Sequence, residues 1–126
     1  MIPIDQTKFA AITESDDPNV IGNCLQTCVA SLLELPLEDV PHFAAQSDWY
    51  DAMCYWLADQ GFAVVDQRHP IEGVLGICMG KSPRGNFTHV VITNGSDELA
   101  HDPHPSRAGL LTFDRWWYLL PTDPAR

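Results

Sequence analysis

Three residues of the sequence, a cysteine, a histidine and an aspartate, are of the types that carry out nucleophilic catalysis. Cys24 stands where a helix is predicted to begin, and the helix dipole and free backbone N–H groups there favour the thiolate, which is the attacking form. His89 lies in a predicted strand between apolar neighbours and can serve as general base. Asp102 follows the hairpin after that strand, where a carboxylate can orient an imidazole. The sequence therefore predicts a nucleophile, a base and an orienting group on elements that can meet.

The nucleophile depends on the first predicted helix, which we expect over residues 24–35. Asn23 is suited to the N-cap, the apolar residues recur at helical spacing, and Pro36 ends the helix. A short turn is expected over residues 36–40 and a second helix over residues 48–60, which ends at Gly61. Residues 1–22 show no sustained period and indicate an extended arm followed by a polar loop.

The base depends on a set of strands that follow the helices. Short apolar or alternating runs predict strands over residues 62–65, 74–79, 87–93, 98–101 and 110–120. The pair Asn94-Gly95 is a strong hairpin signal, so the third and fourth strands should be antiparallel. Two helices followed by an antiparallel sheet predict an α+β fold.

Composition narrows the classes of protein to which the chain can belong. Its 126 residues predict one domain spanning 1–126, and 7 basic against 17 acidic side chains give a net charge of −10. Such a charge disfavours nucleic acid and anionic membranes as partners. No apolar run is long enough for a spanning helix and no secretory signal is recognisable, so we expect a cytoplasmic protein with four free thiols.

Several local stretches together resemble the papain-like cysteine peptidase superfamily, in particular the small bacteriocin-processing (peptidase C39-like) type and short phage-encoded relatives. The stretches that carry this resemblance are Gln6 in an N-terminal arm, Gly22-Asn23-Cys24, Ser31 to Pro41, Ser82-Pro83-Arg84-Gly85, His89-Val90-Val91-Ile92, and His101-Asp102-Pro103-His104-Pro105. They are distributed over most of the chain.

The resemblance implies a papain-like fold, in which N-terminal helices pack on a small antiparallel sheet. It implies that Cys24 is the nucleophile, His89 the base and Asp102 the orienting residue. Gln6 would be the side-chain donor of the oxyanion hole, and the backbone amide of Cys24 the other donor. A long polar segment separates Gln6 from Cys24, so Asn23, beside the nucleophile, is a second candidate donor as well as a candidate N-cap.

Arg84 is a candidate substrate-binding residue. It is one of few basic residues and lies in a loop bounded by glycine and proline just before the His89 strand, where a guanidinium can hold a carboxylate or a carbonyl. A surface arginine is the plain alternative. Core packing is the default for Cys28, Cys54 and Cys78, and for Trp116-Trp117-Tyr118 we expect one face in the core and the other at a rim.

A metal site is a rival interpretation of the same residues. Cys24 and Cys28 are one turn apart on a helix, and His101, Asp102 and His104 form a compact group that zinc can accept. The chain has no Cys-x-x-Cys pair, and scattered ligands of this kind arise readily by chance, so we expect neither a metal nor another cofactor.

The leading functional hypothesis is a cysteine hydrolase that cleaves an amide, peptide or isopeptide bond through an acyl-enzyme. Its substrate would be a peptide or amide, or a whole protein, in the cytosol of a bacterium or of a phage-infected cell. An acyltransferase would use the same thioester with an amine acceptor. A catalytically inactive papain-like binding module, such as a phage protein that sequesters a host factor, is the alternative from a different class.

Overall fold

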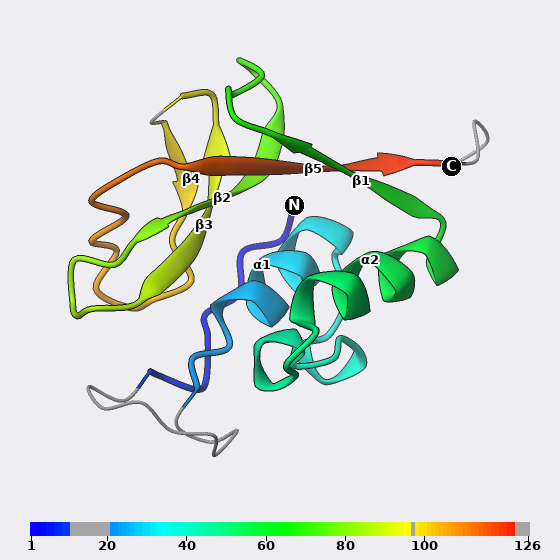
Figure 1. Ribbon diagram of the computed structural model, residues 1–126, viewed down its shortest axis with the longest axis horizontal. Coiled ribbons are helices and arrows are strands. Elements are labelled where there is room, and N and C mark those ends of the chain that lie inside the picture. The colour runs from blue at the N-terminus through cyan, green and yellow to red at the C-terminus, as the bar shows by residue number, and fades with distance from the viewer. Residues whose placement is uncertain (11–20, 97, 123–126) are drawn as a thin grey trace.

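The computed structural model describes residues 1–10, 21–96 and 98–122 and has two α-helices and a five-stranded antiparallel sheet (Figure 1). The chain is therefore a small α+β fold, as the sequence predicted. The helices are α1 (Cys24–Leu33) and α2 (Trp49–Asp59), with the short 3₁₀ turns η1 (Leu37–Asp39) and η2 (Phe43–Ala45) between them. The strands are β1 (Phe62–Gln67), β2 (Leu75–Lys81), β3 (Thr88–Asn94), β4 (Leu99–His101) and β5 (Arg115–Pro121).

Helix α1 begins at Cys24, as predicted, but ends before Leu35. Glu34 adopts the left-handed conformation, with φ 58° and ψ 42°, and its backbone N–H donates to the Ala30 carbonyl. Leu35 precedes Pro36, whose ring disfavours a helical conformation in the residue before it. Helix α2 lies within the predicted bounds, and the turn predicted over 36–40 is η1, whereas η2 was not predicted.

The strands form one sheet in the order β1-β5-β2-β3-β4. The predicted hairpin is confirmed, since the Asn94 N–H donates to the Glu98 carbonyl over 2.8 Å and β4 pairs antiparallel with β3. The ladder between them has an irregularity at Ile92 and Thr93. His89 lies near the start of β3 and is opposite Gly80 of β2.

The last strand is shorter than predicted, because residues 110–114 lie beside β2 without regular pairing. The Leu111 and Asp114 N–H groups donate to the carbonyls of Lys81 and Met79 over 2.8 and 2.9 Å. The carbonyl oxygen of Thr112 approaches Gly80 so closely that a Cβ there would lie 1.7 Å from it. This irregular approach needs a glycine, and a residue pattern that favours strands does not reveal it.

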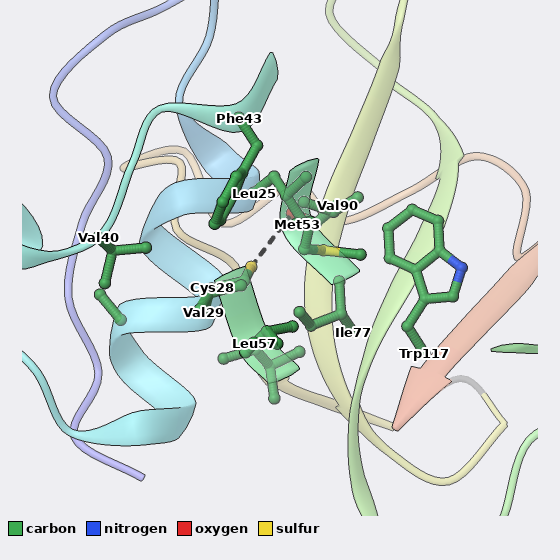
Figure 2. Close-up of a cluster of buried hydrophobic side chains, with 12 residues drawn as sticks. Leu25, Cys28, Val29, Val40, Phe43, Met53, Leu57, Ile77, Val90 and Trp117 are labelled. Carbon is green, nitrogen blue, oxygen red and sulfur yellow. Dashed lines mark hydrogen bonds between the residues drawn. The ribbon is translucent and has the colours of Figure 1, made fainter. Parts of the chain in front are cut away.

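Both helices lie on one face of the sheet, where α1 packs on β3 and α2 on β1 (Figure 1). Figure 2 shows the main core between them, in which the Sγ atom of Cys28 lies 3.8 Å from the Val90 carbonyl oxygen. Cys28 and Cys78 are fully buried, as expected, whereas Cys54 is only partly buried.

The opposite face of the sheet is also covered, which corrects the prediction for the aromatic run of β5. Leu110 and Phe113 pack over a second cluster that contains Trp116 and Tyr118, while Trp117 belongs to the main core. Trp116, Trp117 and Tyr118 are each at most 5% exposed, so neither face of this run reaches a rim. No helix among the described residues is both long and apolar enough to cross a membrane.

Replacing Gly80 with alanine tests whether the close approach of the Thr112 carbonyl to Gly80 stabilises β2, the strand that pairs with β3 opposite His89. The new Cβ would overlap the Thr112 carbonyl, which is backbone and must move away, so we expect Gly80→Ala to lower the free energy of unfolding by about 1–3 kcal/mol. Urea denaturation of the variant and the wild type measures the difference. An unchanged midpoint would show that the segment over residues 110–114 is not held against β2.

Candidate functional site

The site is built around a buried pair formed by His89 and Asp102. The Nε2 atom of His89 lies 2.7 Å from Oδ1 of Asp102, and the two side chains are 3% and 0% exposed. Burial by itself raises the pKa of Asp102, but the hydrogen bonds from His89 and from two backbone N–H groups lower it below its ordinary value. The carboxylate is therefore ionised at neutral pH and accepts the proton of Nε2, which leaves Nδ1 as the ring nitrogen that can act on a nucleophile.

The loop after β4 closes around the carboxylate of Asp102. The backbone N–H of His104 donates to Oδ1 over 2.9 Å and that of Gly109 donates to Oδ2 over 2.8 Å. Arg107 accommodates the bend with a φ of 53°, and its guanidinium donates to the Asp102 carbonyl over 2.6 Å. In Figure 1 this loop, orange at the left, curls back beside the start of β3. Backbone groups of this loop thus hold the carboxylate in place.

Cys24, the first residue of α1, interacts with the same imidazole. Its side chain is partly buried and lies close enough to His89 to contribute to the raised pKa of the imidazole. The structure therefore brings together Cys24, His89 and Asp102, which come from a helix start, a strand and a loop. The sequence analysis predicted this trio. The packing of α1 on β3 is what places Cys24 beside His89.

The His89 ring carries a proton at neutral pH. Burial lowers the pKa of the imidazole, but the hydrogen bonds to Asp102 and Cys24 and the charges of both groups outweigh burial and raise the pKa to about 9. The charged ring lies beside the first residue of α1 and can give a proton to a group bound there. The arrangement can thus hold a nucleophile and a proton donor together.

The N-terminal arm carries Gln6 to the start of α1. The Gln6 backbone N–H donates to the Pro103 carbonyl over 2.9 Å, and its Nε2 donates to the Lys8 carbonyl over 2.9 Å. The same Nε2 is 3.6 Å from where a Cβ on Gly22 would stand, close to the nucleophile in the chain. Gln6 is 6% exposed, and its Oε1 has no hydrogen-bond partner among the described residues. Gln6 therefore lies near the start of α1 although a polar segment separates it from Cys24 in the sequence. Residues 11–20 of that segment lie outside the described part of the chain.

Asn23 holds this arm against the helix, a role that sequence reasoning did not find. Its Oδ1 accepts from the Thr7 and Lys8 N–H groups over 3.0 and 2.8 Å, and its Nδ2 donates to Thr7 Oγ1 and Gln26 Oε1. It occupies the N-cap position without a side-chain capping bond. The oxyanion role for Asn23 stays a prediction, but both hydrogens of its amide already have acceptors. The hydrogen-bond partners of Asn23 in the arm are 15 and 16 residues away in the sequence, and no local sequence pattern indicates a bond over that separation.

Arg84, His104 and Phe9 lie on the side of the trio formed by the loop after β4 and the N-terminal arm, and Phe9 was not singled out from the sequence. Arg84 Nη1 is 3.4 Å from Ser106 Oγ in the loop after β4. The His104 ring packs edge-on against His89, with centroids 6.4 Å apart, and against Phe9 of the arm at 5.3 Å. Phe9 is 45% exposed. The wall beside His89 is therefore part aromatic and part cationic.

The residues of the rival metal site face other partners. Cys28 points toward the Val90 carbonyl, and His101 Nε2 lies 2.7 Å from the Ile4 carbonyl oxygen. Both oxygens of Asp102 are hydrogen-bonded. Within residues 1–10, 21–96 and 98–122, no group of three or more His, Cys, Asp or Glu side chains could hold a metal ion.

Comparison with known proteins adds no relative to this picture. No protein-family model, no curated protein and no solved structure matches the chain.

The raised pKa of His89 predicts how stability depends on pH. An unfolded histidine titrates near 6.5, so the stabilisation from the protonated ring is complete below that pH and is lost as the pH rises through about 9. We expect the free energy of unfolding to fall by up to about 3 kcal/mol over this range in the wild type, and by less in His89→Gln. Urea denaturation at a series of pH values measures both. Equal pH dependence in the two proteins would show that His89 is not the group that titrates.

Proposed function

We propose that the chain is a papain-like cysteine hydrolase that cleaves an amide-type acyl bond. The observation that carries this proposal is the buried His89–Asp102 hydrogen bond of 2.7 Å, together with the influence of the Cys24 side chain, at the start of α1, on the pKa of the same imidazole. A buried histidine with a raised pKa between a carboxylate and a thiol is the arrangement that activates a cysteine nucleophile. A core histidine with a purely structural role does not require a thiol at a helix start.

In the proposed reaction the Cys24 sulfur attacks the carbonyl carbon of the substrate. The negative charge that develops on the carbonyl oxygen is received by the Cys24 backbone N–H and by the Nε2 group of Gln6. His89 gives its proton to the leaving nitrogen, the C–N bond breaks, and the acyl group stays on sulfur as a thioester. A water molecule then gives a proton to His89 and adds to the carbonyl carbon, and the carboxylic acid leaves as the C–S bond breaks.

Asp102 has two roles in this scheme. It fixes the ring so that Nδ1 faces the sulfur, and its charge stabilises the imidazolium that persists until the leaving group departs. Gln6 fits the oxyanion role because it is a buried amide beside the helix start and only one hydrogen of its Nε2 has a hydrogen-bond acceptor among the described residues.

The test uses p-nitrophenyl acetate, because an activated ester can acylate a nucleophile whose natural substrate is not identified. The proposal expects a burst of p-nitrophenolate and an intact-protein mass increased by one acetyl group, located on Cys24 by peptide mapping. Incubation with a complex peptide library then shows whether amide bonds are hydrolysed. Acetylation of Cys24 without turnover of any amide would favour the acyltransferase, and sluggish reaction of all four thiols would favour a binding module.

Two alanine variants of neighbouring cysteines separate chemistry from packing. We expect Cys24→Ala to lose the burst and the acetylation while it keeps the wild-type melting temperature, because the side chain is only partly buried. Cys28→Ala should retain activity in its folded fraction but lose about 1 kcal/mol or more of stability, since Cys28 is fully buried in the core. Burst kinetics and thermal denaturation measure both variants. An active Cys24→Ala protein would end the assignment of the nucleophile.

The carboxylate of Asp102 is tested by the isosteric amide. Both oxygens of Asp102 accept hydrogen bonds, so Asp102→Asn must turn its NH₂ toward either His89 or the Gly109 N–H, and it has no charge to stabilise the imidazolium. We expect the acylation rate to fall on the order of 10²–10⁴-fold. The rate of acetylation by p-nitrophenyl acetate, with circular dichroism as the control for folding, is the measurement. A variant that is folded and fully active would remove Asp102 from the mechanism.

A further inference from the structure

We propose that Arg84, His104 and Phe9 form the subsite for the leaving group, and that the preferred substrate carries a carboxylate within the first two residues after the scissile bond. This inference rests on the proposed cysteine hydrolase activity and names its substrate class. It concerns a wall of the site that lies next to His89.

A continuous series of contacts leads from the catalytic imidazole to the guanidinium. The His104 ring packs edge-on against the His89 ring, with centroids 6.4 Å apart. The Ser106 backbone N–H donates to His104 Nδ1 over 3.0 Å, and Ser106 Oγ lies 3.4 Å from Arg84 Nη1. Arg84 is therefore linked to the proton donor through Ser106 and His104 of the loop after β4.

The guanidinium of Arg84 has no carboxylate partner among the described residues, in contrast to Arg107 and Arg115, whereas Arg68, exposed after β1, has none either. Arg107 pairs with Asp5 over 2.6 Å and Arg115 pairs with Asp66 over 2.7 Å. Within residues 1–10, 21–96 and 98–122 the Arg84 side chain makes one hydrogen bond, to the Ser106 hydroxyl, and no ion pair. A guanidinium is suited to bind a carboxylate by parallel hydrogen bonds, so Arg84 is available for one supplied by a ligand.

His104 and Phe9 supply the rest of the wall. His104 Nδ1 accepts a hydrogen bond, so in the neutral ring Nε2 carries the proton and is free to donate. Burial and the charge of Arg84 lower the pKa of His104, which keeps the ring neutral at pH 7. Phe9 packs on this ring and remains 45% exposed. A peptide segment can thus find an apolar surface, one N–H donor and one cation.

The position of the wall indicates which part of the substrate contacts it. His89 must reach the nitrogen that leaves, so the segment bearing that nitrogen lies over the imidazole. His104 flanks the same ring, and Arg84 lies beyond His104. The leaving segment, rather than the acyl segment bound to Cys24, therefore runs toward the guanidinium.

Charge gives this subsite a reason to be selective. The chain carries a net charge of −10, so its surface repels anionic peptides in general. A local guanidinium beside the site attracts a carboxylate that the rest of the surface disfavours. An anionic leaving group is thereby favoured at this position and disfavoured elsewhere.

The experiment measures how amines compete with water for the acetyl-enzyme formed from p-nitrophenyl acetate. In this aminolysis the amine nitrogen bonds to the carbonyl carbon, the C–S bond breaks, and the amine proton passes through His89 to the sulfur. Because this is the reverse of bond cleavage, the amine occupies the leaving-group subsite. The matched acceptors are glutamate amide against glutamine amide, and glycyl-glutamate amide against glycyl-glutamine amide.

We expect one of the glutamate acceptors to be acetylated about three- to fivefold faster than its glutamine partner, as for a partly exposed ion pair. This preference should vanish in Arg84→Gln and change to a preference for glycyl-lysine amide in Arg84→Glu. The control is Arg68→Gln, which removes the same charge from an exposed position after β1. Equal rates for both pairs in the wild type, or a preference kept in Arg84→Gln, would overturn the subsite.

A second measurement separates failure of the subsite from failure of the hydrolase. The alkylation rates of Cys24 by iodoacetate and iodoacetamide are compared, since this ratio reports the charge preference at the sulfur and needs no acyl-enzyme. The ratio of iodoacetate to iodoacetamide should fall about threefold in Arg84→Gln and stay constant in Arg68→Gln. An unchanged ratio in Arg84→Gln contradicts the role of Arg84, whereas absence of acetylation at Cys24 contradicts the hydrolase itself.

Discussion

The imidazole–carboxylate pair of His89 and Asp102 is the interaction on which the arrangement of the site depends. An ionised carboxylate with no exposure to solvent would be costly without partners, and Asp102 has three hydrogen-bond donors, His89 and the N–H groups of His104 and Gly109. The loop after β4 must therefore bend around the carboxylate. The same bend places Arg107 against Asp5 of the N-terminal arm and so fixes the arm beside α1.

The arm and the loop support each other on opposite sides of the trio. Gln6 binds the Pro103 carbonyl, His101 lies against the Ile4 carbonyl, and Asn23 binds the N–H groups that follow in the arm. Each of these bonds joins segments that are distant in sequence, so the order of one depends on the others. A buried polar network of this kind specifies one arrangement when all its members are paired. The exception is the side-chain oxygen Oε1 of Gln6, which is buried and has no hydrogen-bond partner among the described residues.

Local patterns in the sequence predicted the elements but not how their neighbours cover them. Helical spacing located the start of α1 at Cys24, and Asn94-Gly95 located the hairpin that brings Asp102 back toward His89. Alternation along β5 predicted an exposed face for its aromatic run. This prediction was wrong because a distant segment covers Trp116, and that segment is placed by an irregular approach at Gly80 that the sequence does not reveal. Single residues can indicate a turn or a cap, but they do not show which distant segment lies over a strand.

The same distinction explains which parts of the candidate site could be found from the sequence. Cys24, His89 and Asp102 each have a local reason for their positions, namely a helix start, a strand and the end of a hairpin, so their types and places suggested chemistry before any geometry was known. Phe9 and His104 have no such signal, because their relation to His89 arises only when the arm and the loop after β4 close on each other. Groups that react must stand on rigid elements, whereas groups that select a substrate can be contributed by loops. The proposed leaving-group subsite therefore depends on tertiary contacts, whereas the proposed reacting groups can be recognised by residue type and position in the sequence.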